Sequence, residues 1–455
     1  MNNITILLDN QAHIAGLSKR TSDEIKAFLT ISNPVFQKGL QLGLTNWGVP
    51  RSLQYFSESN KILSAPIGSL NDILNILADH ISMNDVEVCD NRASNKLPKY
   101  FNKVRFSPVL RDYQQDMINA CEDKSIGVIQ AKTGAGKTIF ALSLILKKQE
   151  ATLFLVNTVE LANQTIASFA KNTNLSEDDI GFIGSGKFSL KPITVGLHQT
   201  MARLSEEQFG LLNDHIGMVI ADEVHICPAK TYYKTLTNLR AKYKWGISGT
   251  PKREDGLTRA IFFATGPLIH QVPESKLENV LITPDVEYIE TDYTYPIFST
   301  EDYQPMISDL SENRDRNDII IEKLKEFKGK STVLLCTRLS QVEYLKDVLG
   351  EEAVILTSKM KKKDRVEVMS QLHKREKDIV ISTYGLFSTG IDIPHLEVLF
   401  LCAPLKSEIK LRQAAGRLMR KAKGKTSANI IDIVDPNVGI LYNQSRTRKR
   451  VLSNL

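Results

Sequence analysis

Two hydrophobic patterns alternate along the chain from about residue 125 onward. One is a short apolar run bounded by turn residues, which has the length of a strand buried on both faces of a parallel sheet. The other is a longer stretch with apolar residues at helical spacing, as at 136–149 and 159–172. This alternation predicts an α/β domain with a parallel sheet. The expected strands lie within 125–131, 151–157, 193–198, 217–223 and 244–250.

The same alternation begins again after residue 330, which predicts a second parallel sheet in tandem with the first. We expect domains at 101–275 and 316–455, joined by an acidic, tyrosine-containing linker at 276–315. The expected strands lie within 331–337, 351–358, 377–383, 397–403 and 429–435, and the expected helices within 339–350, 362–375 and 407–422.

The first hundred residues follow a different pattern and predict a small separate α+β domain at 1–100. Strands are expected within 3–9 and 51–66, and a helix within 69–81. Trp47 precedes the second of these strand regions. We expect its large side chain to anchor the core of the domain, with stacking on a nucleic-acid base as the alternative.

Length and cysteine content narrow the class of protein. The 455 residues are too many for one core and fit two or three domains. No apolar run is long enough to span a bilayer, and the N-terminus lacks the basic and apolar segments of a signal peptide. The five cysteines are scattered without a C-x-x-C pair, so we expect a reducing cytoplasmic location and neither disulfides nor zinc.

The distribution of charge says more than its sum. The net charge is only +6, from 58 basic and 52 acidic residues. Three basic runs nevertheless lie in the last hundred residues, at 359–365, 406–425 and 446–450. Each run alone is ordinary for a solvated face, but together they favour a surface that follows phosphates.

A glycine-rich loop follows the first expected strand, in the sequence Ala-Lys-Thr-Gly-Ala-Gly-Lys-Thr at 131–138. Its glycines let the backbone curl so that N–H groups point at phosphate oxygens, and the helix that follows adds partial positive charge. The lysine reaches the β- and γ-phosphates, and the threonine hydroxyl is a ligand for Mg²⁺. The residues expected to bind ATP here are Ala131, which stands where the pattern has Gly, then Lys132, Thr133, Gly134, Ala135, Gly136, Lys137 and Thr138.

A second Gly-x-Gly-Lys sequence at 184–187 does not have this context. Phe188 stands at the position of the Mg²⁺ ligand, and Pro192 follows where a helix would be needed. The pattern therefore predicts an exposed turn between two strands. The alternative is a loop whose Lys187 contacts a nucleic-acid backbone.

An acid pair, Asp222 and Glu223, ends another expected strand. Open α/β sheets bind ligands at the carboxyl ends of their strands, so this position suits catalysis. One carboxylate, that of Asp222, is expected to hold Mg²⁺, and the other to orient and deprotonate the water that attacks the γ-phosphate. Neighbouring side chains on a strand point to opposite faces, so the two converge only at a frayed strand end.

The phosphate loop and the sequence Asp-Glu-Val-His at 222–225 resemble the superfamily 2 helicases and translocases. The resemblance covers roughly residues 105–435 and implies two tandem RecA-like parallel-sheet domains behind the small N-terminal domain. The sequence at 248–256 is closer to the DNA repair and recombination branch than to the DEAD-box RNA helicases. Further motifs of the family occur in order at 110–114, 157–164, 195–200, 246–256, 334–345, 381–394 and 413–420.

The family's roles carry over to matching positions of this sequence. The resemblance implies that Gln114 reads the adenine edge with Arg111 nearby, and that Gly390 and Asp392 face the ATP side of the cleft. Residues expected to couple ATP state to domain movement are His225, Ser248, Thr250 and Gln413. Residues expected to contact the nucleic-acid backbone are Thr158, Gln199, Thr200, Thr337, Arg338, Thr383 and Ser388.

Spacing supports the last motif independently. Gln413, Arg417 and Arg420 are four and three residues apart, which predicts that they share one helix face. The two arginines are expected to stabilise the γ-phosphate during hydrolysis. Such arginine fingers raise the rate by a factor on the order of 10³–10⁵.

Residues 43–74 resemble the N-terminal domain of phage recombination helicases, through an Asn-Trp-Gly ahead of strands and a helix. The resemblance implies an ATP- and Mg²⁺-dependent DNA helicase that acts on single-stranded and branched DNA, located in the host cytoplasm if a phage encodes it.

Two other functions remain open. One is an RNA helicase or annealing motor, because phosphate contacts do not separate DNA from RNA. The other is a phosphate-loop protein that binds ATP without acting as a motor. The second α/β domain and its arginines argue against this last function.

Overall fold

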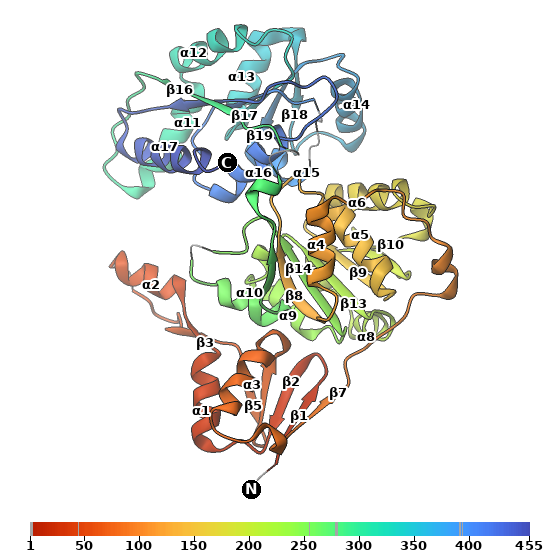
Figure 1. Cartoon of the computed structure of the whole chain (residues 1–455). Coiled ribbons are helices and arrows are strands. Elements are labelled where there is room, and N and C mark those ends of the chain that lie inside the picture. Colours follow the sequence, from red (N-terminus) through yellow and green to blue (C-terminus); the bar gives the residue numbers. More distant parts are fainter. Residues whose placement is uncertain (1–2, 44, 254, 278–280, 391–392, 394) are drawn as a thin grey trace. The chain divides into compact units, whose positions relative to one another are not determined.

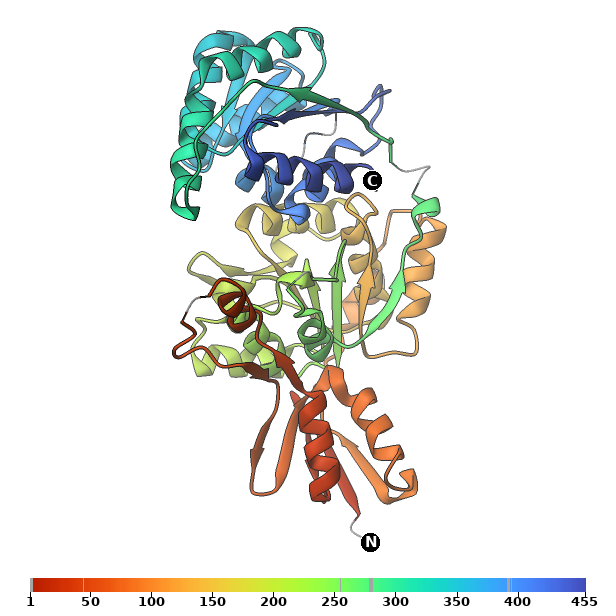
Figure 2. The ribbon, with the colours of Figure 1, turned by 90° about the vertical axis from the view of Figure 1, so that its left-hand side faces the viewer.

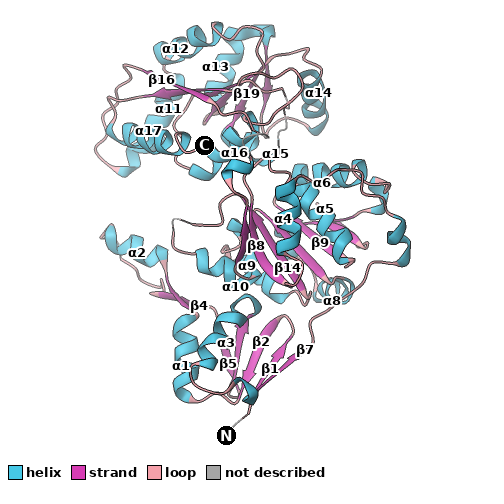
Figure 3. Cartoon of the chain, viewed as in Figure 1, coloured by secondary structure: helices cyan, strands magenta, loops and turns pink. Residues whose placement is uncertain are grey.

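The computed structural model covers residues 1–455 and describes all of them except 1–2, 44, 254, 278–280, 391–392 and 394, and the side chains at 300, 362 and 388–390. The chain separates into two compact units, residues 1–132 with 136–272 and residues 133–135 with 273–455. Figure 3 shows the sheets with helices against them, so the α/β prediction is confirmed. Among the described residues, no helix combines the length and the apolar character needed to cross a membrane.

The N-terminal part of the first unit is a five-stranded sheet with two helices against it. Its strand order is β5-β6-β2-β1-β7. Ile6, Ile14, Ile25 and Ile73 lie in its core and are fully buried. The elements are β1 (Ile4–Leu8), β2 (Gln11–Ala15), α1 (Lys19–Phe28), β5 (Ser57–Ser59), β6 (Ile62–Pro66), α3 (Leu70–Ala78) and β7 (Val86–Asp90).

An arm extends from this sheet between α1 and β5. Strands β3 (Thr30–Ser32) and β4 (Ser52–Gln54) pair at its base, and α2 (Pro34–Gln41) lies beyond them. Figure 1 shows α2 standing away from the sheet, and Figure 2 shows it from that side. Trp47 lies in this arm with 96% of its surface exposed. The expectation of a core anchor is therefore wrong, because the residue sits outside the layer that covers the sheet.

The N-terminal sheet packs firmly on the first RecA-like domain. Phe263 of α10 (Thr258–Thr265) belongs to the same core cluster as the N-terminal strands. Its ring lies 5.6 Å from that of Phe28, and the ring of Tyr55 lies 5.1 Å from that of Tyr233. A Cβ at Gly68 would overlap the backbone of α10, so the two surfaces meet at van der Waals contact. These contacts join the sheet and the domain into one unit.

An eight-stranded sheet forms the first RecA-like domain, in the order β11-β10-β12-β9-β13-β14-β8-β15. All its pairs are parallel except the one between β10 and β11. The strands are β8 (Ile126–Gln130), β9 (Thr152–Val156), β10 (Gly181–Gly184), β11 (Lys187–Ser189), β12 (Ile193–Leu197), β13 (Met218–Asp222), β14 (Tyr243–Ser248) and β15 (Leu268–Gln271). The helices include α4 (Asp112–Ala120), α5 (Lys137–Lys148), α6 (Val159–Lys171), α7 (His198–Met201), α8 (Glu206–His215) and α9 (Lys230–Asn238).

The second Gly-x-Gly-Lys sequence is a hairpin turn, as predicted. Gly184 pairs with Lys187 across the antiparallel strands β10 and β11. Ser185 and Gly186, the two residues between them, have φ of 50° and 79°. Two successive residues with positive φ match the twist of a two-residue hairpin. This loop therefore lacks the strand-to-helix geometry of a phosphate site.

A six-stranded parallel sheet forms the second unit, in the order β16-β21-β20-β17-β19-β18. Its strands are β16 (Asp285–Glu290), β17 (Thr332–Cys336), β18 (Ala353–Leu356), β19 (Ile379–Thr383), β20 (Val398–Leu401) and β21 (Asn429–Val434). Its helices are α11 (Tyr303–Glu312), α12 (Arg314–Lys325), α13 (Leu339–Leu349), α14 (Lys362–His373), α15 (Tyr384–Gly390), α16 (Glu408–Leu418) and α17 (Gly439–Leu452).

The segment 276–315, expected to be a linker, contributes to this second sheet. Strand β16 pairs with β21 along its whole length, and α11 follows it. The strand lies at the sheet edge, where Asp285, Glu287 and Glu290 are exposed. Acidic residues on an edge strand are compatible with pairing on one side only. The same acids hid the strand from a pattern that favours buried apolar runs.

The basic run 446–450 is not a free tail. It lies in α17, where Arg448 is 2% exposed and its guanidinium is 2.8 Å from the carboxylate of Asp432 on β21. Arg450 pairs with Glu408. A buried charge requires a partner, and Asp432 supplies it. The run therefore helps fix α17 to the sheet, and only part of it remains for a phosphate-following surface.

Lys244 on β14 carries a cost in stability that depends on pH. It is 1% exposed, its Nζ donates to the carbonyl of Leu236 at 3.1 Å, and burial with the nearby Arg92 lowers its pKa to about 7. The unfolded chain binds more protons at this site than the folded chain between pH 7 and the usual lysine pKa. The contribution of Lys244 to folding stability therefore rises with pH over that window.

We predict that Lys244→Met raises the midpoint of thermal unfolding at pH 7, and that the gain shrinks at pH 9. Calorimetry at both pH values checks this, with Lys124→Met, at an exposed lysine, as the control. A loss of stability of equal size at both pH values would show that the buried ammonium stabilises the fold.

Candidate active site

The loop 131–136 joins β8 to α5 and has the backbone of a phosphate site. Gly134 and Gly136 have φ of 92° and 77°, in the left-handed region that side chains disfavour. A Cβ at Gly136 would also overlap the amide of Gln114. Helix α5 begins directly after the loop, so the partial positive charge of its first turn faces the loop. This curl of the backbone is what a polyphosphate requires.

Both members of the acid pair converge on Lys137. Its Nζ is 2.6 Å from Oε1 of Glu223 and 3.9 Å from Oδ1 of Asp222. Asp222 is the last residue of β13, and Glu223 has φ of 49°. This left-handed conformation ends the strand and turns the second carboxylate toward the first, at a cost of about 1–3 kcal/mol. The structure thus brings together the residues that the sequence placed at a frayed strand end.

The charges at this point do not balance. Burial, with the neighbouring Glu223, raises the pKa of Asp222 to about 6. Burial also acts to raise the pKa of Glu223, but Lys137 and His225 outweigh it and lower that pKa to about 2. One ammonium therefore faces two carboxylates in a poorly solvated place. A divalent cation that brings phosphate ligands and keeps some of its water fits such a donor set, with Thr138 in the first turn of α5.

A hydrogen-bond chain leads from Glu223 to the neighbouring strand. Nδ1 of His225 is 3.2 Å from Oε2 of Glu223 and 3.0 Å from Oγ of Ser248. That hydroxyl accepts the N–H of Thr250 at 3.2 Å. Strands β13 and β14 are adjacent, which is why His225 and Ser248, 23 positions apart along the chain, meet here. Three of the expected coupling residues are therefore in direct contact with one another or with the acid pair.

Sequence reasoning missed the next members of this chain. Arg253 donates to the backbone carbonyl of His225 at 2.6 Å, and its Nε donates to Asp255 at 2.9 Å. The signal was present, since four charged residues, at 252–255, directly follow Ser-Gly-Thr-Pro. Asp255 and Arg253 also act on the pKa of Tyr55, which burial raises. Arg253 and Asp255 therefore extend the hydrogen-bond chain beyond His225 and lie near Tyr55 of the N-terminal domain.

Gln114 ties α4 to the phosphate loop. It is 4% exposed, its Oε1 accepts the N–H of Arg111 at 3.0 Å, and its Nε2 donates to the carbonyl of Gly136 at 3.5 Å. The guanidinium of Arg111 donates to the hydroxyl of Tyr113 at 2.9 Å. The structure therefore places Gln114 against the loop and Arg111 next to Gln114, and the expected contact of Gln114 with adenine stays a prediction.

The carboxyl edge of the first RecA-like sheet is divided between two groups of residues. The loops after β13, β14 and β8 carry the acid pair, the Ser248 turn and the phosphate loop. Thr158 directly precedes α6 after the neighbouring strand β9, and Gln199 and Thr200 lie on α7 after β12. Thr158 already caps α6, since its hydroxyl accepts the N–H of Leu161 at 3.2 Å. The order of the strands thus puts ATP candidates and backbone-contact candidates on adjacent halves of one edge.

The second unit has a similar edge. Thr337 directly follows β17, and Thr383 ends the adjacent β19, where it pairs with Cys336. Arg338 donates to the side chain of Gln304 at 2.5 Å. The structure therefore gathers these candidates at neighbouring strand ends. Asp392 lies outside the described residues, as do the side-chain positions of Ser388 and Gly390.

The prediction that Gln413, Arg417 and Arg420 share one helix face is wrong for Arg420. Helix α16 ends at Leu418 with Met419 as its C-cap, so only the first two residues lie on it. Arg420 instead forms a β-bridge with Leu281, and the N–H of Ile282 donates to the carbonyl of Met419 at 2.7 Å. Pairing with a neighbouring segment therefore ends the helix two residues before the second arginine.

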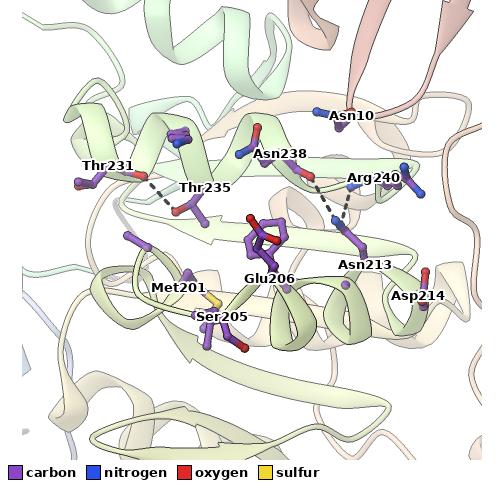
Figure 4. A pocket seen from close by; sticks show the side chains of 15 residues that line it. Asn10, Met201, Ser205, Glu206, Asn213, Asp214, Thr231, Thr235, Asn238 and Arg240 are labelled. Carbon is purple, nitrogen blue, oxygen red and sulfur yellow. Dashed lines mark hydrogen bonds between the residues drawn. The ribbon is translucent and has the colours of Figure 1, made fainter.

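A cavity of about 750 Å³ lies away from these residues, between α8, α9 and the N-terminal domain. Figure 4 shows Asn213 bridging the two helices, through bonds to the carbonyl of Asn238 and the N–H of Arg240. Asn10 reaches it from the N-terminal sheet and donates to the carbonyl of Thr237 at 3.2 Å. Its walls carry both acids and bases, so they favour no single class of ligand.

Comparison with known proteins supports this geometry. A family model described as the res subunit of type III restriction enzymes matches residues 107–253, and the helicase conserved C-terminal domain matches residues 315–422. The chain is a superfamily 2 helicase. The family resemblance is thereby confirmed, and the helicase hydrolyses ATP and binds nucleic acid.

Its relatives carry different names. A putative ATP-dependent RNA helicase of Acanthamoeba polyphaga mimivirus is 28% identical over 76% of this chain and 68% of its own. A DNA 3′-5′ helicase XPB of Kineococcus radiotolerans is 26% identical over 71% of this chain and 59% of its own. The structure of T4 UvsW aligns with 99% of the helicase and 97% of its own chain, at 19% identity and a TM-score of 0.45 that is too low to carry a functional comparison.

Glu223→Gln tests the acid pair. Glutamine keeps the shape but cannot accept a proton from water, so we predict that kcat for ATP hydrolysis falls by about 10² or more. Binding of ATP, measured by calorimetry, should change by less than tenfold. Glu206→Gln on α8 is the matched control. An unchanged kcat would rule out Glu223 as the base.

Proposed function

We propose that the helicase is an ATP-dependent DNA translocase that remodels branched DNA. The observation that carries this proposal is the division of one sheet edge between the acid pair with its phosphate loop and the hydroxyl-bearing segments after β9 and β12. A movement at one half of such an edge reaches the other half through adjacent β-strands. ATP binding and release therefore alter the contacts with a nucleic-acid strand.

In the proposed mechanism, the phosphate loop and Lys137 hold the polyphosphate of ATP. Thr138 and Asp222 would hold Mg²⁺, which would neutralise charge on the phosphates of ATP. Glu223 orients the water and accepts its proton. Arg417 and Arg420 are proposed to stabilise charge on the γ-phosphate. Their different backbone settings, helix and β-bridge, mean that each is positioned independently of the other.

We assign the contacts with the nucleic-acid strand to hydroxyl and amide side chains at the ends of β-strands in both units. These contacts hold phosphates and carry no information on base sequence. DNA is favoured over RNA because the sequence at 248–256 resembles the repair and recombination branch, and because one relative bears the name of a DNA helicase. The RNA helicase name of another relative keeps RNA as the second candidate.

Branched substrates are favoured by the N-terminal domain. The rings of Tyr55 and Phe28 fix it on the first RecA-like domain, so it forms one unit with that part of the motor. The resemblance of residues 43–74 to phage recombination helicases points the same way. A non-motor ATP-binding protein would not need the second sheet, which matches the helicase C-terminal model.

The decisive assay is ATP hydrolysis with no nucleic acid, single-stranded DNA, linear duplex, a four-way junction and RNA. We predict the largest stimulation with the junction and little with RNA. Lys137→Ala should abolish ATP hydrolysis with each of these nucleic acids and without any, because it removes a group that holds the phosphates. Stimulation by RNA alone would contradict the DNA proposal, and equal stimulation by linear and branched DNA would contradict the branched one.

Lys187→Ala tests the hairpin. Lys187 lies in β11 with an exposed side chain, beside β10 and on the same side of the sheet order as β12. We predict weaker binding of DNA and an unchanged ATP affinity in the absence of DNA. Fluorescence anisotropy with labelled DNA and calorimetry with ATP measure the two. A loss of ATP affinity would contradict the assignment.

A further inference from the structure

The arm between β3 and β4 presents an aromatic ring to solvent in a fixed setting. Trp47 is 96% exposed, whereas the other tryptophan, Trp245, is fully buried. The arm consists of residues 33–43 and 45–51 on the described part of the chain. Almost the whole surface of this ring is therefore open to a binding partner.

The setting of Trp47 is not that of a loose loop. Asn33 closes the base, since its side chain accepts the N–H of Val35 at 3.0 Å and donates to the carbonyl of Pro50 at 2.8 Å. Asn46, directly before the tryptophan, donates to the carbonyl of Phe36 at 3.0 Å.

Two glycines complete the turn. A Cβ at Gly39 of α2 would overlap the Asn46 side chain, so the helix and the turn touch closely. Gly48 has φ of 76° and open space around its missing Cβ. The backbone thus reverses directly after Trp47 and leaves the ring clear of its own chain.

The base of the arm is fixed to the motor. Strand β4 leads directly into Tyr55, whose N–H donates to the carbonyl of Leu29 at 3.0 Å. The ring of Tyr55 packs on Tyr233 and Phe263 of the first RecA-like domain at 5.1 and 5.5 Å. A force on the arm is therefore transmitted to the first RecA-like domain through packed aromatic side chains rather than through a linker.

Charge favours a polyanion as the occupant. Between Glu24 and Glu58 the chain carries no Asp or Glu, while Lys38 and Arg51 lie within the arm. The guanidinium of Arg51 is 5.9 Å from the ring of Phe36. A segment that carries an exposed indole and basic residues but no acids has the composition that binds unpaired bases, by stacking on the base and pairing with its phosphates.

We propose that Trp47 stacks on unpaired bases at the branch of a DNA substrate, and that Lys38 and Arg51 contact the flanking phosphates. The proposal deepens the proposed function and rests on it for the choice of DNA. It assigns a base-contacting role to a part of the chain outside both RecA-like sheets. Contact of this type is independent of sequence because every base has a stacking face.

Intrinsic fluorescence tests this directly, because the chain has only two tryptophans. A base stacked on Trp47 quenches its emission, while the buried Trp245 is out of reach. We expect a synthetic fork with single-stranded arms to quench the wild type at saturation. Trp47→Phe should show no quenching, since it leaves Trp245 as the only emitter. Quenching that persists in Trp47→Phe would contradict the assignment.

Affinity provides the second readout. Trp47→Ala should weaken binding of the fork by about 5- to 100-fold, and Trp47→Phe should recover most of the loss. Phe298→Ala is the matched control, since that aromatic ring is 92% exposed in the second unit. Unchanged affinity in Trp47→Ala would overturn the proposal, as would a blue shift of the emission that depends on protein concentration, which indicates a second copy as the occupant.

The two proposals fail in different ways. If no nucleic acid stimulates ATP hydrolysis but the fork still quenches Trp47, the motor proposal fails and the base contact stands. If DNA stimulates hydrolysis equally in wild type and Trp47→Ala and quenches nothing, only the base contact fails. Quenching by RNA and not by DNA would overturn the choice of DNA.

Discussion

The contact of Lys137 with the carboxylates of Asp222 and Glu223 is the interaction around which the described residues of the candidate active site are arranged. One lysine faces both acids, so the pKa of Asp222 is raised while Glu223 keeps the closer contact with Lys137. A bound polyphosphate would attract Lys137 away from Glu223, and a bound Mg²⁺ would supply positive charge to the two carboxylates. Among the described residues, His225 also contacts Glu223, and we propose that its contact with Ser248 transmits the change to the next strand.

The order of the β-strands explains how the contact between His225 and Ser248 could affect the rest of the sheet edge. Because β13 lies between β14 and β9, the acid pair borders both the Ser248 turn and the segments that carry the strand-contact candidates. The N-terminal domain joins the same network, since Arg253 binds the backbone of His225 and lies close enough to Tyr55 to affect its pKa. Contacts therefore join Glu223, His225 and Ser248, and Arg253 extends them toward Tyr55, which directly follows β4 at the base of the arm.

The sequence was most informative where chemistry and pattern coincide. Runs of buried apolar residues located most of the strands of both RecA-like sheets, and the phosphate loop and acid pair followed from their places at strand ends. Features that depend on tertiary partners were missed. The pairing of β16 with β21 was hidden by its acids, the burial of Arg448 depends on Asp432 from another element, and a bridge to Leu281 removed Arg420 from its helix. The burial of Trp47 was predicted wrongly because hydrophobicity alone does not distinguish a ring in the core from a ring exposed to solvent.

The central claim is that the histidine–serine contact transmits the state of the nucleotide to the strand-binding edge. Ser248→Ala removes the hydroxyl that His225 contacts and leaves the acid pair and Lys137 in place. The measurement is ATP hydrolysis with and without saturating single-stranded DNA. The account predicts basal hydrolysis within about twofold of wild type and stimulation by DNA reduced by about tenfold or more, as expected for loss of a coupling of 1–3 kcal/mol. Full stimulation by DNA in Ser248→Ala would contradict it.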